Sequence, residues 1–229
     1  MGPAGSNNAS SCSLSTLERD VLGFHRVGDV PGFEIPARYF QFLRTGDHRL
    51  LEGVLDHHRH DIVSLAVLMS YALRLAKEGP DQCRDDNEVV ALGRIYERAG
   101  LAERALDAFD RASLSSDRYV RAHAFSRLGL IHRRESRHDE AVRAWQGVLE
   151  AAGGRRSLFP LERAATEALA IHHEHRANDL GEAKKYAETM RTQVSGRAAA
   201  DASHRLARLE RKLSQEKKKG DPKVAPLLE

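Results

Sequence analysis

The sequence predicts an all-α protein: a stack of helical repeats (an α-solenoid) preceded by a few separate helices. Apolar residues recur every three or four positions over most of the chain, which is the helical period. Aromatic residues make up only 6%, while Ala, Leu, Arg and Glu are abundant, and this balance favours helices over a β-sandwich or barrel. A pattern of small and large side chains also repeats between residues 92 and 190. With 229 residues and 41% hydrophobic content, the chain can build a core.

Composition excludes several classes of protein. The net charge of +3 is too small to indicate a nucleic-acid partner by itself. No run of eighteen apolar residues is present, and residues 1–13 lack the basic and apolar regions of a secretory signal. The only cysteines, Cys12 and Cys83, do not form a CxxC pair. We therefore expect a protein of a reducing compartment, located in the cytoplasm and without membrane contact.

The N-terminal third predicts a flexible lead-in followed by helices. Ser15 or Thr16 can cap the first helix, and Gly23 can end it. Pro36 suits the first turn of the second helix. In the third segment the polar run 57–60 separates two apolar stripes, which predicts two helices with a break near that run. The helical segments are expected at residues 15–22, 37–44 and 48–78, with Gly79-Pro80 ending the last.

Three copies of one pattern follow. Gly93, Gly129 and Ala170 stand at equivalent positions, 36 and 41 residues apart. In the second half of each copy a small residue precedes an apolar one by seven positions. The third copy is degenerate and carries an extra residue near Asn178-Asp179. The copies read Leu92-Gly93-x-x-Tyr96, Gly100, Ala105, Phe109, Ala112; Leu128-Gly129-x-x-His132, Ser136, Ala141, Trp145, Val148; and Leu169-Ala170-x-x-His173, Ala177, Ala183, Tyr186 or Ala187, Met190.

This pattern resembles the tetratricopeptide repeat, a helix hairpin with a period of about 34 residues. Small residues such as Gly93 let two helices approach closely, and large ones such as Tyr96 and Phe109 fill the groove between them. We therefore expect Tyr96, Phe109 and Trp145 to be buried. The alternative is an ordinary helical bundle with chance spacing.

A basic helix is expected after the repeats. Leu206, Leu209 and Leu213 share one face, which would cap the open end of the stack. Its basic residues allow two interpretations: a patch that contacts the phosphates of nucleic acid, or simply a solvated helix face. The candidate nucleic-acid-binding residues are Arg205, Arg208, Arg211 and Lys212.

Residues 14–65 contain a series of short motifs. In order along the chain they are Leu17-Glu18, Asp29-Val30-Pro31-Gly32, Ile35-Pro36…Tyr39-Phe40, Arg44-Thr45-Gly46-Asp47 and His57-x-x-x-Asp61. In this order they resemble the C-terminal end of the YprB-like ribonuclease H domain, a bacterial family in which a predicted exonuclease domain is followed by helical repeats. With the segment His173-Glu174-His175-Arg176…Asp179, the resemblance covers most of residues 14–213.

The resemblance implies a two-metal nuclease for complete family members, with Mg²⁺ or Mn²⁺ bound by carboxylates. Asp61 matches the last family carboxylate and is the candidate metal ligand and catalytic residue. His57 lies four residues earlier, projects from nearly the same face, and would orient the nucleophilic water. His58 departs from the family, which commonly has Asn at that position.

The larger departure is the missing strand with Asp-x-Glu, which residues 1–60 do not contain. Because Asp61 lacks partner carboxylates, we expect no nuclease activity and no cofactor for this chain alone, which would be a truncated or misannotated chain or a decayed homologue. The alternative for the region 57–61 is a polar helix segment without metal. A second histidine cluster offers His172 and His175 as metal ligands, although His173 has a packing explanation.

The leading function is a non-catalytic interaction module, the C-terminal part of a ribonuclease-H-like exonuclease-type protein. One alternative is a metal-dependent 3′–5′ exonuclease acting on nucleic acid, if a missing catalytic half is supplied. Another is a scaffold that binds a protein or peptide in its repeat groove. The expected organisation is a lead-in at 1–13, a helical domain remnant at 14–79, repeats at 85–196, a basic capping helix at 197–218 and a disordered tail at 219–229.

Overall fold

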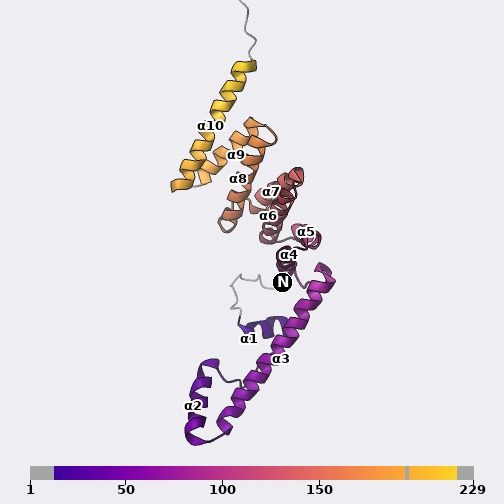
Figure 1. The fold of residues 1–229 in the computed structure, drawn as a ribbon, viewed down its shortest axis with the longest axis vertical. Helices are drawn as coiled ribbons and strands as arrows, with labels where there is room; N and C mark the ends of the chain where they lie inside the picture. Colours follow the sequence, from indigo (N-terminus) through magenta and orange to yellow (C-terminus); the bar gives the residue numbers. More distant parts are fainter. Residues whose placement is uncertain (1–12, 194–195, 221–229) are drawn as a thin grey trace, which may run out of the picture. The chain divides into compact units, whose positions relative to one another are not determined.

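The computed structural model describes residues 13–193 and 196–220, and within them it contains helices and no strand. The predicted all-α class is therefore confirmed. The chain divides into two compact units, Met1–Glu78 and Gly79–Glu229, which Figure 1 colours from indigo to magenta and from magenta through orange to yellow. Residues 1–12 of the expected lead-in and 221–229 of the expected tail lie outside the described residues.

The first unit begins with a capped helical turn. Ser13, rather than Ser15 or Thr16, is the cap, because its hydroxyl accepts a hydrogen bond from the Thr16 amide at 3.3 Å. Gly23 ends the segment with φ 65°, as predicted. Pro36 lies in the first turn of the next helix. The elements are α1 (Leu14–Leu17), the π-helical turn η1 (Glu18–Leu22), the 3₁₀ turn η2 (Gly32–Glu34), α2 (Ile35–Thr45) and α3 (Arg49–Glu78).

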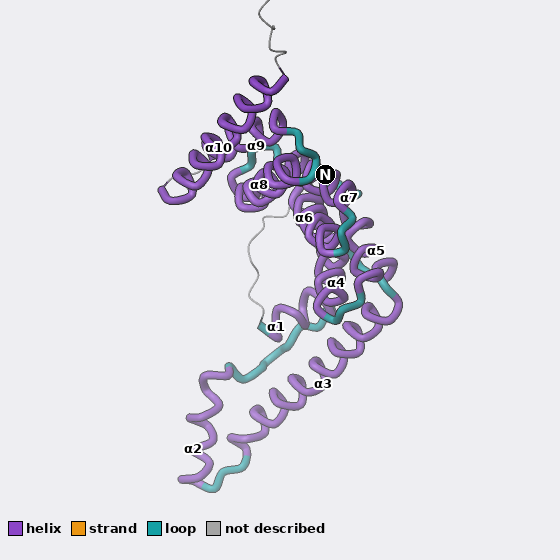
Figure 2. Tube along the Cα trace, turned by 45° about the horizontal axis from the view of Figure 1, so that its top comes forward, coloured by secondary structure: helices purple, strands orange, loops and turns teal. Residues whose placement is uncertain are grey.

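The predicted break in the third segment is wrong. Helix α3 runs unbroken for 30 residues, as the tube in Figure 2 shows. The run 57–60 is polar, but it contains neither glycine nor proline, so nothing in its backbone interrupts the helical hydrogen bonds. The polar side chains have partners elsewhere: His57 faces Asp29 in the loop between η1 and η2. Polarity in the middle of α3 therefore marks a site on the helix rather than its end.

The second unit consists of helices that pack in sequence. Each of three successive pairs, α4 with α5, α6 with α7 and α8 with α9, forms a tightly packed hairpin, and neighbouring hairpins also contact each other. Figure 2 shows the pairs following one another from α4 to α10. The helices are α4 (Asp86–Arg98), α5 (Ala102–Ser113), α6 (Arg118–Arg134), α7 (His138–Ala152), α8 (Phe159–His175), α9 (Leu180–Gln193) and α10 (Gly196–Gly220), with 3₁₀ turns η3 (Pro80–Gln82) and η4 (Arg156–Leu158).

The small and large residues of the repeat pattern meet as expected. Gly93 lies against the ring of Phe109, and a Cβ atom at Gly93 would come within 2.7 Å of that ring. Gly129 faces Trp145 in the same way one hairpin later. Phe109, Tyr96 and Trp145 are all buried, as predicted. The pairing of helices agrees with the repeat pattern, and the assignment to the tetratricopeptide class stays a prediction.

The turn inside each hairpin has one residue in the left-handed region. These residues are Gly100 (φ 74°), Ser136 (φ 60°) and Asn178 (φ 52°). The first two are the positions that the sequence alignment pairs. In the third copy the counterpart is Asn178 and not Ala177, because the extra residue of that copy precedes the turn. The backbone angles therefore place the turn of the third copy one residue later than the sequence alignment does.

Helix α10 covers the last hairpin through its leucines. Leu209 is fully buried against Leu180, Ala183 and Ala187 of α9, and Leu206 and Leu213 pack beside it. The predicted apolar face of this helix is therefore used in the structure to cover α9.

Candidate functional site

The two candidate catalytic residues lie in a charged cluster of the first unit, which we call the Arg26 cluster: Glu18, Arg26, Asp29, His57 and Asp61. Glu18 belongs to η1, and Arg26 and Asp29 belong to the loop between η1 and η2. His57 and Asp61 are one helical turn apart on α3, so they face the loop together. The structure thus brings His57 and Asp61 side by side and adds three residues to them.

Arg26 is the centre of the cluster. Its Nε and Nη2 donate to the two carboxylate oxygens of Glu18, both at 2.6 Å. Nη2 also donates to Asp61 at 2.6 Å, and Nη1 donates to Asp29 at 2.9 Å. The Arg26 side chain is only 10% exposed and that of Glu18 only 1%. One guanidinium group therefore holds carboxylates from three separate segments.

His57 bridges the two aspartates of the cluster. Its Nδ1 lies 2.8 Å from Asp29 Oδ1, and its Nε2 lies 3.5 Å from Asp61 Oδ2. The ring is therefore oriented by the loop on one side and by its own helix on the other. Both aspartates are also ion-paired with Arg26.

The charges of the cluster support one another. The hydrogen bond from Arg26 lowers the pKa of Glu18 despite the opposing effect of burial, and Ser64 adds a second hydrogen bond. Burial also opposes ionisation of Asp29, but hydrogen bonds from Arg26 and His57 lower its pKa. The Glu18 contact in turn raises the pKa of Arg26. The buried ion pairs therefore stay charged over the ordinary pH range.

The family resemblance implies a pair of divalent metal ions, and the Arg26 cluster does not fit them. Carboxylate oxygens are suitable ligands for Mg²⁺ or Mn²⁺. Here those oxygens converge on a guanidinium, which takes the place that a metal cation would need. Over the described part of the chain, no three acidic, histidine or cysteine side chains are arranged to hold a metal ion. We therefore derive no metal-dependent step from Asp61.

The second histidine cluster packs the last hairpin. The His173 ring stacks on Tyr186, with ring centroids 5.5 Å apart and an interplanar angle of 19°. The rings of His172 and His173 are arranged edge to face, with their centroids 5.4 Å apart. Burial lowers the pKa of His172, so its ring is neutral at neutral pH. The packing explanation for His173 therefore agrees with the geometry.

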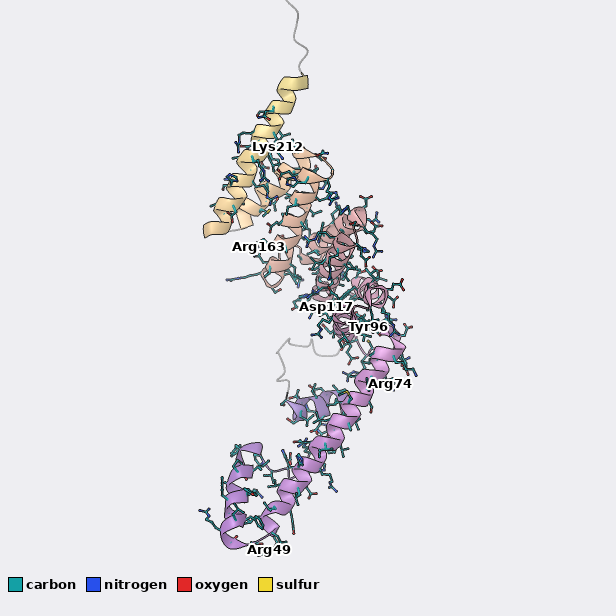
Figure 3. The ribbon with its side chains drawn as sticks, in the orientation of Figure 1. Arg49, Arg74, Tyr96, Asp117, Arg163 and Lys212 are labelled. Carbon is teal, nitrogen blue, oxygen red and sulfur yellow. The ribbon has the colours of Figure 1, made fainter. Side chains whose placement is uncertain are left out.

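The predicted nucleic-acid-binding residues surround a buried carboxylate of α8, and we call this group the Glu174 cluster: Glu174, Arg205, Arg208 and Lys212. Arg208 donates to both oxygens of Glu174 at 2.9 and 2.6 Å, and Lys212 donates at 2.9 Å. Arg205 lies 3.6 Å away. Figure 3 labels Lys212 on α10. Burial alone would raise the pKa of Glu174, but hydrogen bonds from Arg208 and Lys212 lower it to about 2.

Three of the four candidate phosphate ligands therefore serve an internal ion pair. Arg205, Arg208 and Lys212 join α10 to α8, and any phosphate would compete with Glu174 for them. Arg211 is exposed on the same helix. The role of Glu174 as their partner is not apparent from the sequence, because Glu174 stands within a histidine-rich run. The role of Arg26 is not apparent either, because a loop arginine carries no periodic signal.

The first unit also exposes many large apolar side chains. Phe24 and Leu22 of the N-terminal segment line a cavity of about 490 Å³ with Val63 and Val67 of α3. Phe33 is 84% exposed, and ten large apolar residues of α2 and α3 are between 47% and 66% exposed. The exposed members on these two helices are Tyr39, Phe40, Leu43, Leu55, Ile62, Val63, Leu65, Val67, Met69 and Leu73. Apolar surface of this extent is typical of an interface.

Comparison with known proteins adds two findings. A protein-family profile described as the RNase_H superfamily matches residues 1–73. The uncharacterized protein YprB of Bacillus subtilis (strain 168) is 26% identical over 205 residues, which cover 88% of this chain and 48% of the relative. The chain thus spans about half the length of that curated relative. None of the described helices is long and apolar enough to cross a membrane. Residues 1–73 are therefore similar to the RNase H superfamily, and most of the chain is similar to YprB.

Proposed function

We propose that this chain is a non-catalytic interaction module, the helical C-terminal part of a ribonuclease-H-like, exonuclease-type protein. The observation that carries the proposal is the position of Arg26. Its guanidinium is bonded to Asp61, which is a candidate catalytic residue, and to Glu18 and Asp29. A buried ion-pair network of this kind fixes the helices of the first unit, and it leaves Asp61 bound to another side chain rather than available to a metal.

The exposed apolar side chains of the first unit support the same proposal. Exposed rows of Leu, Ile, Val and Met on α3 require cover by other polypeptide. We propose that the remainder of a ribonuclease-H-like domain provides that cover, in the same chain or in another. The repeat unit then contributes a surface for a protein, peptide or nucleic-acid partner. A reducing, cytoplasmic location belongs to this proposal and rests on the cysteine content.

A second candidate function is a metal-dependent nuclease that works once a catalytic half is supplied. The observation in its favour is the geometry of His57 and Asp61, which share a face of α3, with the Asp61 side chain 31% exposed. Withdrawal of the loop that carries Arg26 and Asp29 would free Asp61 for other ligands. The Bacillus relative is about twice as long as this chain, so its length leaves room for a second half.

A nuclease assay separates the two candidates. The purified chain is incubated with labelled single- and double-stranded substrates in Mg²⁺ or Mn²⁺, and we expect no cleavage. Metal-dependent cleavage that disappears in Asp61→Asn, and persists in the matched variant Asp56→Asn, would overturn the non-catalytic proposal. Asp56 is a suitable control because it lies on the same helix and is 62% exposed.

A further inference from the structure

A groove between α4 and α6 of the second unit is lined mainly by positively charged side chains. Its volume is about 580 Å³. Four arginines line it, and Glu97 is the acidic residue among them, so the lining carries a net charge of +3 (four positive charges minus one). We call this feature the arginine groove, defined by Arg94, Arg98, Arg127, Arg134, Glu97 and Ile95.

Glu97 orients two of these arginines. It is ion-paired with Arg134 and lies 3.6 Å from Arg127, and its side chain is only 16% exposed. A single carboxylate neutralises one guanidinium, so positive charge remains after both contacts are made. Planar guanidinium groups bind oxyanions through paired hydrogen bonds, which makes such a groove suitable for phosphate or carboxylate.

Arg94 provides an independent observation. Its Nε is buried and has no hydrogen-bond partner in the described structure. Its Nη2 lies 3.3 Å from Nδ1 of His123, a histidine whose pKa is lowered by burial and by Arg94 and Arg127. A buried N–H group without a partner is costly. An oxyanion in the groove would supply the missing acceptor and would favour the charged form of His123.

An aromatic ring continues the row on α6. Tyr119 is 45% exposed, and its ring lies 4.4 Å from that of His123. Tyr119, His123 and Arg127 recur every four residues, and Arg134 follows seven residues later, so all four share one face of the helix. At 1.5 Å per residue, the row from Tyr119 to Arg134 is about 22 Å long. It therefore offers several anion-binding groups beside one exposed ring.

We propose that the arginine groove binds single-stranded nucleic acid, with its arginines on the phosphates and Tyr119 stacked on a base. The proposal rests on the interaction role proposed above and names the ligand of that surface. Arginines together with an exposed aromatic ring are the usual components of a single-strand site, because an unpaired base can stack. An acidic peptide would use the arginines but not the ring, so the observations favour nucleic acid. The Glu174 cluster offers less, since its cations are already paired.

The proposal is tested by fluorescence anisotropy of a labelled twenty-nucleotide oligothymidine, titrated with the full chain in EDTA at several salt concentrations. The triple variant Arg94→Gln, Arg98→Gln, Arg127→Gln should weaken binding at least tenfold. It should also flatten the dependence of log affinity on log salt by about 2, at about 0.7 per lost contact. Tyr119→Ala should weaken binding about tenfold through lost stacking.

A charge-matched control replaces exposed arginines of other helices: Arg143→Gln, Arg163→Gln, Arg191→Gln, of which Arg163 is labelled in Figure 3. This variant should change affinity less than threefold. An equal loss of affinity in the two triple variants would overturn the proposal. So would duplex binding that is as tight as single-strand binding and is unchanged in Tyr119→Ala. If circular dichroism shows that the groove triple does not fold, the single variant Arg98→Gln, at an exposed position, replaces it.

A labelled oligoglutamate peptide tests the competing ligand. Peptide binding tighter than oligothymidine binding, and lost in the groove triple variant, would overturn the nucleic-acid proposal while leaving the interaction role in place. Because all titrations are made in EDTA, their outcome does not depend on whether the chain cleaves nucleic acid. Failure of the groove proposal and failure of the non-catalytic proposal are thus seen in different assays.

Discussion

Arg26 joins residues that are far apart in the sequence. Its guanidinium links η1, the following loop and α3, and nearly all of its surface is removed from water. Removing one partner from such a buried network lowers the free energy of unfolding by more than the intact ion pair contributes to it. The reason is that the remaining charges are left without compensation. Glu18 would be the most affected, since its side chain is almost completely buried.

We therefore expect Arg26→Gln to destabilise the first unit by roughly 3 kcal/mol. Hydrogen exchange measured by mass spectrometry should show faster exchange at residues 49–64. The single tryptophan, Trp145, lies in the second unit, so the unfolding transition seen by its fluorescence should not move.

The matched control for this prediction is Arg49→Gln. Arg49 also forms an ion pair, with Asp47 at 2.9 Å, but its side chain is 77% exposed. Exposed pairs of this kind contribute about 0–1 kcal/mol. Equal protection in the two variants would mean that the Arg26 network does not hold the first unit together.

At the scale of elements, the turns within the hairpins show where the backbone is under strain. Gly100 adopts the left-handed region without cost, and asparagine tolerates it, as at Asn178. Ser136 has the same conformation with φ 60°, and a serine pays a steric penalty there because of its Cβ atom. The turn between α6 and α7 is thus the strained member of the three.

Ser136→Gly should stabilise the second unit by about 0.5–1 kcal/mol, because the relief of strain exceeds the added freedom of the unfolded chain. For a unit of this size the gain corresponds to a rise in Tm of about 1–4 °C in the tryptophan-monitored transition. Ser136→Ala keeps the Cβ atom and should give no rise. A lower Tm for the glycine variant would show that the Ser136 side chain, rather than its backbone, supports the turn.

At the scale of the whole molecule, carboxylates with lowered pKa values occur in both units. They are Glu18, Asp29 and Asp47 in the first unit and Glu174 in the second. A carboxylate whose folded pKa lies below its unfolded value stabilises the protein fully above the unfolded pKa. That contribution is lost as the pH falls towards the folded pKa. For Glu174 the window runs from its ordinary value of 4.5 down to about 2.

The Glu174→Gln variant tests this at the junction of α8 and α10. Above about pH 5 it should be less stable than the parent chain by roughly 3 kcal/mol, because three cations lose a buried partner. The difference should shrink steadily between pH 4.5 and pH 2, as followed by urea unfolding at each pH. The control Glu188→Gln affects an exposed pair at 3.7 Å and should change little at any pH. A difference that persists at pH 2 would show that Glu174 acts through packing rather than charge.

The sequence predicts local features of this protein well and long-range ones poorly. Gly23, Pro36 and Gly79-Pro80 act on their own neighbours, so the helix ends beside them are where we expect them. The predicted break in α3 is wrong because polar side chains alone do not end a helix, and the polar ring of His57 has its partner in Asp29. The partners of Arg26 and Glu174 are up to 38 residues away, and no local pattern reveals them.

The left-handed residue of each hairpin also bears on how related chains are recognised. Between successive copies the residue has changed from glycine to serine to asparagine, while the course of the backbone has been retained. Divergence of this kind preserves the backbone conformation and changes the amino-acid sequence. A sequence comparison therefore fails first at the third copy and aligns it one residue out of register. A comparison of backbone angles identifies all three copies. Relatives of this protein with still more divergent repeats are best sought by their turns.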